Sequence, residues 1–179
     1  ASEDYITARE MILASSVNAR IHICHVSTEG SAAEIRFAKS RGVKVTCETA
    51  PHYFMLTDEL LAKRDADYRM NPPLRTPKDV RAIIDAVKDG TIDCIITDHA
   101  PHAAEEKADF EKAPNGVVGL ETSLAATLTA LYHTGEISLN RVVELMCVNP
   151  RKLLGLEVPA IQPGKTADLV IADINRKWT

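Results

Sequence analysis

Short apolar runs, separated by longer stretches of helical spacing, make up the hydrophobic pattern of this chain. Three runs rich in Ile, Val and Cys, at residues 21–26, 43–50 and 92–98, have the length and composition of buried strands. A fourth run, at residues 161–174, alternates apolar and polar positions after a Pro-Gly turn and predicts a strand of a different sheet. Because the first three runs alternate with helical stretches, they predict parallel βαβ units and an α/β fold.

The helical stretches carry their own end signals. Ser27 or Thr28 opens the second helix and Gly42 closes it, whereas Pro77 stands in the first turn of the third helix and Gly90 follows its end. The expected helices cover residues 2–20, 27–42, 76–90, 120–132 and 139–146. A closed parallel barrel needs eight strand-helix units and about 250 residues. Three such units in 179 residues cannot close one.

The composition excludes several classes of protein. The chain is 45% hydrophobic and 26% charged with a net charge of −4, and it has no cluster of Lys and Arg of the kind that binds nucleic acid. No apolar run approaches the ~20 residues of a membrane span, and the first residues lack a signal-peptide pattern. Cysteines at positions 24, 47, 94 and 147 form no CxxC pair. They predict buried free thiols in a reducing cytoplasm and no cysteine metal site.

Polar residues follow the predicted strands at their carboxyl ends. His25 ends the first strand, His52 follows the second, and Asp98 ends the third. Because the carboxyl ends of parallel strands meet at one edge of a sheet, these side chains are expected to lie together, and their types suit Zn²⁺. Simpler interpretations stay open: His25 as a core histidine, His52 as a loop residue that holds backbone, and Asp98 as the cap of a turn. For His22, packing or hydrogen bonding within its strand is expected.

Two loops add candidate binding residues. The segment "KAPNGVVGLET", with Asn115 and Gly116, suits the presentation of backbone groups to an anion or a carbonyl oxygen, although a simple turn before a helix explains it equally well. The double proline of "RMNPPLRTP" makes that loop rigid, so Asn71 and Arg75 are expected to be held in place for substrate recognition.

Taken together, these segments resemble the dihydroorotase branch of the metal-dependent cyclic amidohydrolases. The motifs "HICHVST", "CETAPHYFMLTDE", "YRMNPPLR", "ITDHAPH", "KAPNGVVGLET" and "PGKTADLVIADI" occur in the family's order over essentially the whole chain. The resemblance implies an α/β fold that is part of a TIM-like (β/α)₈ barrel. Residues 1–155 would supply strands six to eight of that barrel, and residues 156–179 would begin the return into a small β-sandwich subdomain.

The resemblance also implies roles for individual residues. His25 matches a histidine that binds one zinc ion, and Asp98 matches an aspartate that binds the other and moves a proton between the attacking water and the leaving nitrogen. Asn71 matches a residue that bonds the substrate ring, and His102 matches a partner of the substrate carboxylate. Asn115 and Gly116 match the backbone that holds the pyrimidine ring. His52 and His99 look like supporting residues, and His99 would donate a hydrogen bond or cap a turn.

The implied function is the zinc-dependent, reversible hydrolysis of dihydroorotate to N-carbamoyl-aspartate in pyrimidine biosynthesis. The family's first-strand HxH pair, bridging carboxylate and fifth-strand histidine are absent from this sequence. The chain is therefore expected to be the C-terminal part of a longer enzyme and to be inactive alone. The complete enzyme would hold one or two zinc ions. Allantoinase, or another cyclic amidohydrolase, is the alternative enzyme. A non-catalytic partner of aspartate carbamoyltransferase is the alternative outside catalysis. A cytoplasmic location, a small-molecule substrate and a homodimer are further expectations.

Overall fold

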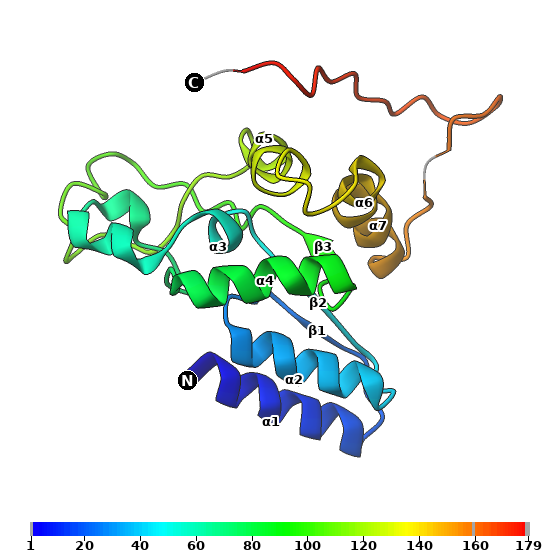
Figure 1. Cartoon of the computed structure of the whole chain (residues 1–179), viewed down its shortest axis with the longest axis horizontal. Coiled ribbons are helices and arrows are strands. Elements are labelled where there is room, and N and C mark those ends of the chain that lie inside the picture. Colours follow the sequence, from blue (N-terminus) through cyan, green and yellow to red (C-terminus); the bar gives the residue numbers. More distant parts are fainter. Residues whose placement is uncertain (1, 159, 178–179) are drawn as a thin grey trace.

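A three-stranded parallel sheet forms the centre of the molecule (Figure 1). The computed structural model describes residues 2–158 and 160–177. The strands β1 (Ile21–Ile23), β2 (Val45–Thr49) and β3 (Cys94–Ile95) lie in the order β1-β2-β3. Ile21 pairs with Val45, and Glu48 pairs with Cys94. The predicted parallel sheet is therefore confirmed, although each hydrogen-bonded strand is shorter than the apolar run that predicted it.

The helices between the strands begin and end where the local signals indicate. In α2 (Glu29–Ser40) the hydroxyl of Thr28 accepts a hydrogen bond from the backbone N–H of Ser31. In α4 (Pro77–Asp89) Thr76 and Asp79 form a capping box, and Gly90 ends the helix in the left-handed conformation with φ 85°. The helix α1 (Ser2–Ser16) packs on α2, and α2 packs on α4, so the three helices lie side by side (Figure 1).

The remaining helical segments are short. Between β2 and α4 the chain forms α3 (His52–Met55), η1 (Asp58–Lys63) and η2 (Ala66–Tyr68). The two helices predicted after the long loop are present and continue into π-helical turns. They comprise α5 (Ser123–Thr127), η3 (Leu128–Tyr132), α6 (Leu139–Val143), η4 (Glu144–Val148) and α7 (Asn149–Leu153).

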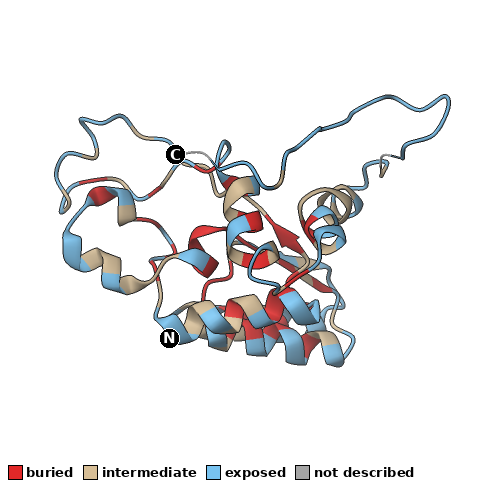
Figure 2. Ribbon diagram, turned by 45° about the horizontal axis from the view of Figure 1, so that its top comes forward, coloured by how far each residue is buried: buried red, intermediate tan, exposed pale blue. Residues whose placement is uncertain are grey.

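The core lies between the sheet and these helices (Figure 2). Ile35, Ile83 and Leu145 are fully buried there, together with Val45 and Cys47 from β2. Successive residues of a strand point to opposite faces, and the alternate positions in β1 and β2 are half-buried or exposed. The helices that pack against the core thus cover one face of the sheet, and the other face carries accessible side chains.

Two sequence-based expectations are wrong. The alternating run at residues 161–174 forms no strand in the part of the chain that the structure describes, and Leu169, Val170 and Ile171 are exposed. A strand needs a hydrogen-bonded neighbour, and no described segment pairs with this one. Among the cysteines, Cys47 and Cys94 are buried as predicted, but Cys24 is exposed because it points away from the helices, and Cys147 is half-buried.

Candidate metal and substrate site

His25 and Asp98 lie just beyond the carboxyl ends of β1 and β3, as the sequence predicts. Both have left-handed backbone, with φ of 43° for His25 and 48° for Asp98. Few non-glycine residues adopt positive φ, and those that do cluster at functional sites, where the surrounding structure holds the strained conformation. Both side chains are half-buried. This combination of position and backbone is expected of residues that are held for chemistry.

His52 connects these two residues in space. It begins α3 directly after β2, and its side chain is only 7% exposed, so the expectation of a loop residue is wrong. Its Nε2 lies 3.7 Å from Oδ2 of Asp98 and is a buried nitrogen without a hydrogen-bond partner among the described residues. Burial, helped by the nearby charge of His25, lowers the pKa of His52 to about 4. The imidazole is therefore neutral at physiological pH.

The three groups fit a divalent cation by the chemistry of their donor atoms. Neutral imidazole nitrogen and carboxylate oxygen are ligands that zinc takes in proteins. Nε2 of His52 is a buried ring nitrogen without a hydrogen-bond partner among the described residues, and a bound group is one way in which such an atom gains a partner. Zinc sites normally take about four ligands, so His25 and Asp98 could supply only part of a ligand set, with His52 beside Asp98.

The long loop after β3 brings most of the predicted substrate-binding residues together. Nε2 of His102 lies 3.1 Å from the carbonyl oxygen of Asn115. Nε of Arg69 donates to Oδ1 of Asn115 (3.1 Å), and the N–H of Gly116 donates to the carbonyl oxygen of Arg69 (3.0 Å). Since the N–H of Gly116 is already paired, it can bind a substrate only by exchanging this bond.

Gly116 occupies a position where only glycine fits. Its φ is 145°, and a Cβ atom there would lie 2.6 Å from Cβ of Ala100 and 3.0 Å from Nε2 of His102. The close approach places the "PNG" segment directly on the segment that follows Asp98. Here the glycine is required by space as well as by backbone conformation.

A single lysine ties this loop to the segment before α4. Nζ of Lys107 donates to the carbonyl oxygens of Ala66 (2.8 Å), Pro114 (3.1 Å) and Arg69 (3.3 Å). Desolvation lowers the pKa of this ammonium group. The sequence analysis missed Lys107, because a lysine in a charged surface loop carries no signal of such contacts.

The "RMNPPLRTP" segment is held in place, but its arginine does not serve as expected. The hydroxyl of Tyr53 donates to the carbonyl oxygen of Pro72 (2.8 Å), and Asn71 is exposed. Arg75, however, donates to Oγ of Ser27 and to Oε2 of Glu3, both at 3.0 Å. Its guanidinium fastens α1 to the start of α2, so a role for Arg75 in substrate recognition is not supported.

His99 acts as a cap. Its Nδ1 accepts hydrogen bonds from the backbone N–H groups of Gly119 (3.0 Å) and Leu120 (3.3 Å). Of the two roles expected for His99, the capping role is the one observed. His133, whose Nε2 lies 2.8 Å from the carbonyl oxygen of Ile174, is exposed and lies outside the site.

Comparison with known proteins agrees with this arrangement. The model of the amidohydrolase family matches residues 7–179. A dihydroorotase of Acetivibrio thermocellus is 51% identical over 179 residues, which are 99% of this chain and 42% of that relative. A dihydroorotase of Geobacter metallireducens is 52% identical over 180 residues, with 100% of this chain and 42% of the relative covered. The chain thus spans less than half the length of these relatives.

Solved structures show the same fold. The crystal structure of a dihydropyrimidinase from Brevibacillus agri matches with a TM-score of 0.85 and 29% identity, over 92% of this chain and 38% of that one. An L-hydantoinase from Arthrobacter aurescens matches with a TM-score of 0.80 and 33% identity, over 90% of this chain and 36% of that one. Within the described residues, no helix has the length and apolar character needed to cross a membrane.

Proposed function

Because the chain belongs to the amidohydrolase family, we propose that it carries part of the active site of a dihydroorotase. The reaction is the reversible hydrolysis of the cyclic amide of dihydroorotate to N-carbamoyl-aspartate. The meeting of Asp98, His52 and the His25 loop at the carboxyl ends of three parallel strands carries the proposal. Identity of 51–52% to dihydroorotases over nearly the whole chain supports the choice of substrate.

We place β1, β2 and β3 as the sixth, seventh and eighth strands of a (β/α)₈ barrel. The order β1-β2-β3 and the helices on one face of the sheet support this placement, because the strands of such a barrel are parallel, sequential and covered outside by helices. Residues 156–179 would then lead out of the barrel toward a small β-sandwich.

His25 and Asp98 are the residues that would hold metal, one for each of two zinc ions. When bound, zinc polarises the amide carbonyl and acidifies water. Asp98 takes the proton of the attacking water and delivers it to the ring nitrogen as the C–N bond breaks, so it acts first as base and then as acid. His52, 3.7 Å away, is neutral and so adds no charge beside the Asp98 carboxylate.

The loop residues hold the substrate in this proposal. Asn71 bonds the ring, and His102 pairs with the substrate carboxylate. Asn115 and Gly116 form the backbone wall against the ring. The contact between His102 and the carbonyl oxygen of Asn115 (3.1 Å) supports this assignment, because it fixes the carboxylate partner relative to that wall.

The test is Asp98→Asn in the complete enzyme. Turnover of dihydroorotate should fall by at least about 10²-fold, the lower end of what a positioned acid-base group contributes, whereas substrate affinity should change little. Asp85→Asn is the matched control, because Asp85 pairs with Arg81 on the exposed surface of α4. Near-normal turnover in Asp98→Asn would refute the proposal.

Two further measurements separate the alternatives. Side-by-side turnover of dihydroorotate and allantoin by the complete enzyme identifies the substrate, and only dihydroorotate should be hydrolysed. The 179-residue chain by itself should show no turnover, because two ligands do not make a zinc site that needs about four.

A further inference from the structure

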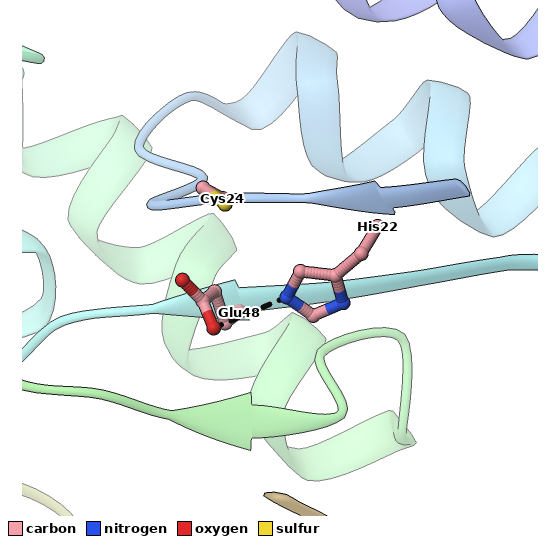
Figure 3. A group of neighbouring side chains, drawn as sticks. All are labelled: His22, Cys24 and Glu48. Atoms are coloured by element: carbon pink, nitrogen blue, oxygen red, sulfur yellow. Dashed lines mark hydrogen bonds and ion pairs between the residues drawn. The ribbon is translucent and has the colours of Figure 1, made fainter. Parts of the chain in front are cut away.

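The turn that contains His25 is fastened to the neighbouring strand. Cys24 lies at the end of β1, near Glu48 of β2, and the chain then turns toward α2 (Figure 3). The N–H of Val26 donates to the carbonyl oxygen of Glu48 (2.8 Å), and the carbonyl oxygen of Val26 accepts a hydrogen bond from the hydroxyl of Thr49 (2.8 Å). Both backbone groups of the residue after His25 are therefore held by β2.

Glu3, in the first turn of α1, holds the next two residues of the turn. Its Oε1 accepts hydrogen bonds from the backbone N–H groups of Ser27 (2.9 Å) and Thr28 (3.3 Å) and from the hydroxyl of Thr28 (3.2 Å). Its Oε2 accepts hydrogen bonds from the hydroxyl of Ser27 and from Nη2 of Arg75 (3.0 Å). Nε of Arg75 also donates to Oγ of Ser27 (3.0 Å). One carboxylate and one guanidinium thus fix both the backbone and the side chain of Ser27.

These contacts are shielded from solvent. Ser27 and Thr28 are buried, and the side chains of Glu3 and Arg75 are only 16% and 22% exposed. A buried N–H group without an acceptor is costly, and a negative charge is favourable at the start of a helix such as α2. The contacts lie among the helices and not on the accessible face of the sheet. They therefore do not depend on what covers that face in the complete protein.

The conformation of His25 explains why such a restraint is needed. Its φ is 43°, and a non-glycine residue keeps this strained conformation only where the surrounding structure determines it. The bonds from β2 to Val26 and those from Glu3 and Arg75 to Ser27 provide that structure. The chain after His25 cannot rotate toward a relaxed conformation without breaking several buried hydrogen bonds.

We propose that Glu3 and Arg75 are positioning residues for His25, which hold its backbone in the conformation from which the imidazole binds a metal ion. The inference rests on the function proposed above, in which His25 is a zinc ligand. Glu3 and Arg75 act through Ser27 and do not themselves bind the metal or the substrate. Residues that orient a metal ligand strengthen metal binding, because the ligand then loses less freedom when the ion binds.

Titration of the metal-free complete enzyme with Zn²⁺, in competition with a chelating dye, tests the inference. Glu3→Gln keeps the size of the side chain but offers one acceptor oxygen in place of two, so the bonds to Ser27 and Arg75 cannot all form. Affinity for the zinc ion at His25 should fall by about 10-fold, the lower end of the loss caused by orienting partners. Glu34→Gln makes the same chemical change on the exposed surface of α2 and should bind Zn²⁺ as the parent does.

Two further variants separate positioning from general stability. Arg75→Met should weaken zinc binding in the same way. The double variant with Glu3→Gln should be little weaker than either single variant, because each change removes the other residue's partner. Ile83→Val, which leaves a small cavity in the core, should leave zinc affinity unchanged although it destabilises the fold.

A last comparison shows whether the effect passes through His25. His25→Asn removes the ligand of one zinc ion, and adding Glu3→Gln should not weaken the binding of the other ion. Parent-like zinc affinity in Glu3→Gln, or a further loss when it is added to His25→Asn, would overturn the inference and leave the proposed function intact. A complete enzyme that neither binds zinc nor hydrolyses dihydroorotate would overturn the proposed function and this inference with it.

Discussion

Replacing Gly116 with alanine should loosen the wall of the proposed substrate site. The new Cβ would lie 2.6 Å from Cβ of Ala100 and 2.8 Å from its carbonyl oxygen. Because the second of these atoms belongs to the backbone, a side-chain rotation cannot relieve the clash. Either position 116 or the chain at Ala100 must move.

The size of the effect follows from two contributions. A non-glycine residue at φ 145° is strained by about 1–3 kcal/mol, and overpacking at a tight contact costs about 1–3 kcal/mol more. The total destabilisation is about 2–6 kcal/mol. It acts on a segment held in place by two hydrogen bonds of 3.0 Å each, from the N–H of Ala100 to the carbonyl oxygen of Val117 and from the N–H of Gly116 to that of Arg69. Since loops open locally, these two bonds should break before the core unfolds.

Hydrogen exchange of backbone amides measures this opening directly. In Gly116→Ala the amides at positions 100 and 116 should lose protection by at least about 30-fold, which corresponds to 2 kcal/mol. Amides of α4 should keep their protection. In the complete enzyme proposed above, the KM for dihydroorotate should rise, because His102 and Asn115 would no longer be fixed relative to each other.

The control is Gly135→Ala. Gly135 also has positive φ, 76°, but nothing lies within 4 Å of the position that its Cβ would take. It therefore bears the backbone strain without the clash, and protection at positions 100 and 116 should be unchanged. Unaltered exchange of these amides in Gly116→Ala would refute the close approach on which the reasoning rests.

Two other predictions concern ionisable groups. Because the pKa of His52 is about 4 in the folded protein against an ordinary 6.5, the unfolded chain binds more protons between these values. Stability of the metal-free protein should therefore be intact above about pH 7 and fall by about 3 kcal/mol by pH 4. Urea unfolding across this range should show the loss, and a pH profile that is the same in His52→Gln would contradict it. Arg75→Met removes the bonds to Glu3 and Ser27 (each 3.0 Å) and should cost about 2–3 kcal/mol in unfolding free energy. In the complete enzyme the KM for dihydroorotate should not change in this variant, and an increased KM at unchanged stability would restore Arg75 to substrate recognition.

The parts of the fold that could be predicted are those specified by neighbours in sequence. Thr28, Pro77 and Gly90 act on the helix turn in which they stand, so the ends of α2 and α4 follow from local patterns. The strand predicted at residues 161–174 depends on a distant partner. Its alternating pattern is compatible with a strand, but the strand forms only where a neighbouring strand supplies the hydrogen bonds.

The same distinction applies to the site. The positions of His25 and Asp98 follow from parallel strands, which the pattern predicts. The role of Arg75 depends on Glu3, 72 residues away in sequence, and no local signal reveals that contact. Side chains alternate between the two faces along β1, and this alternation places Cys24 on the accessible face. The run "HICHV" sets Cys24 among apolar residues, so it predicts burial on both faces and hides this exposure. His52 is buried and lies 3.7 Å from Asp98, and no local pattern reveals this contact between segments far apart in sequence.

Lys107 has a consequence for how the site can open. One ammonium group bonds three carbonyl oxygens, two before α4 and one in the loop after β3, so neither segment can swing outward without giving up its share of the same cation. The two segments are therefore expected to open together, since Arg69 also bonds Asn115 and Gly116 across the same contact. Acetylation of the Lys107 amine, or its replacement by a neutral side chain, would leave only these bonds of Arg69 to hold the segments together.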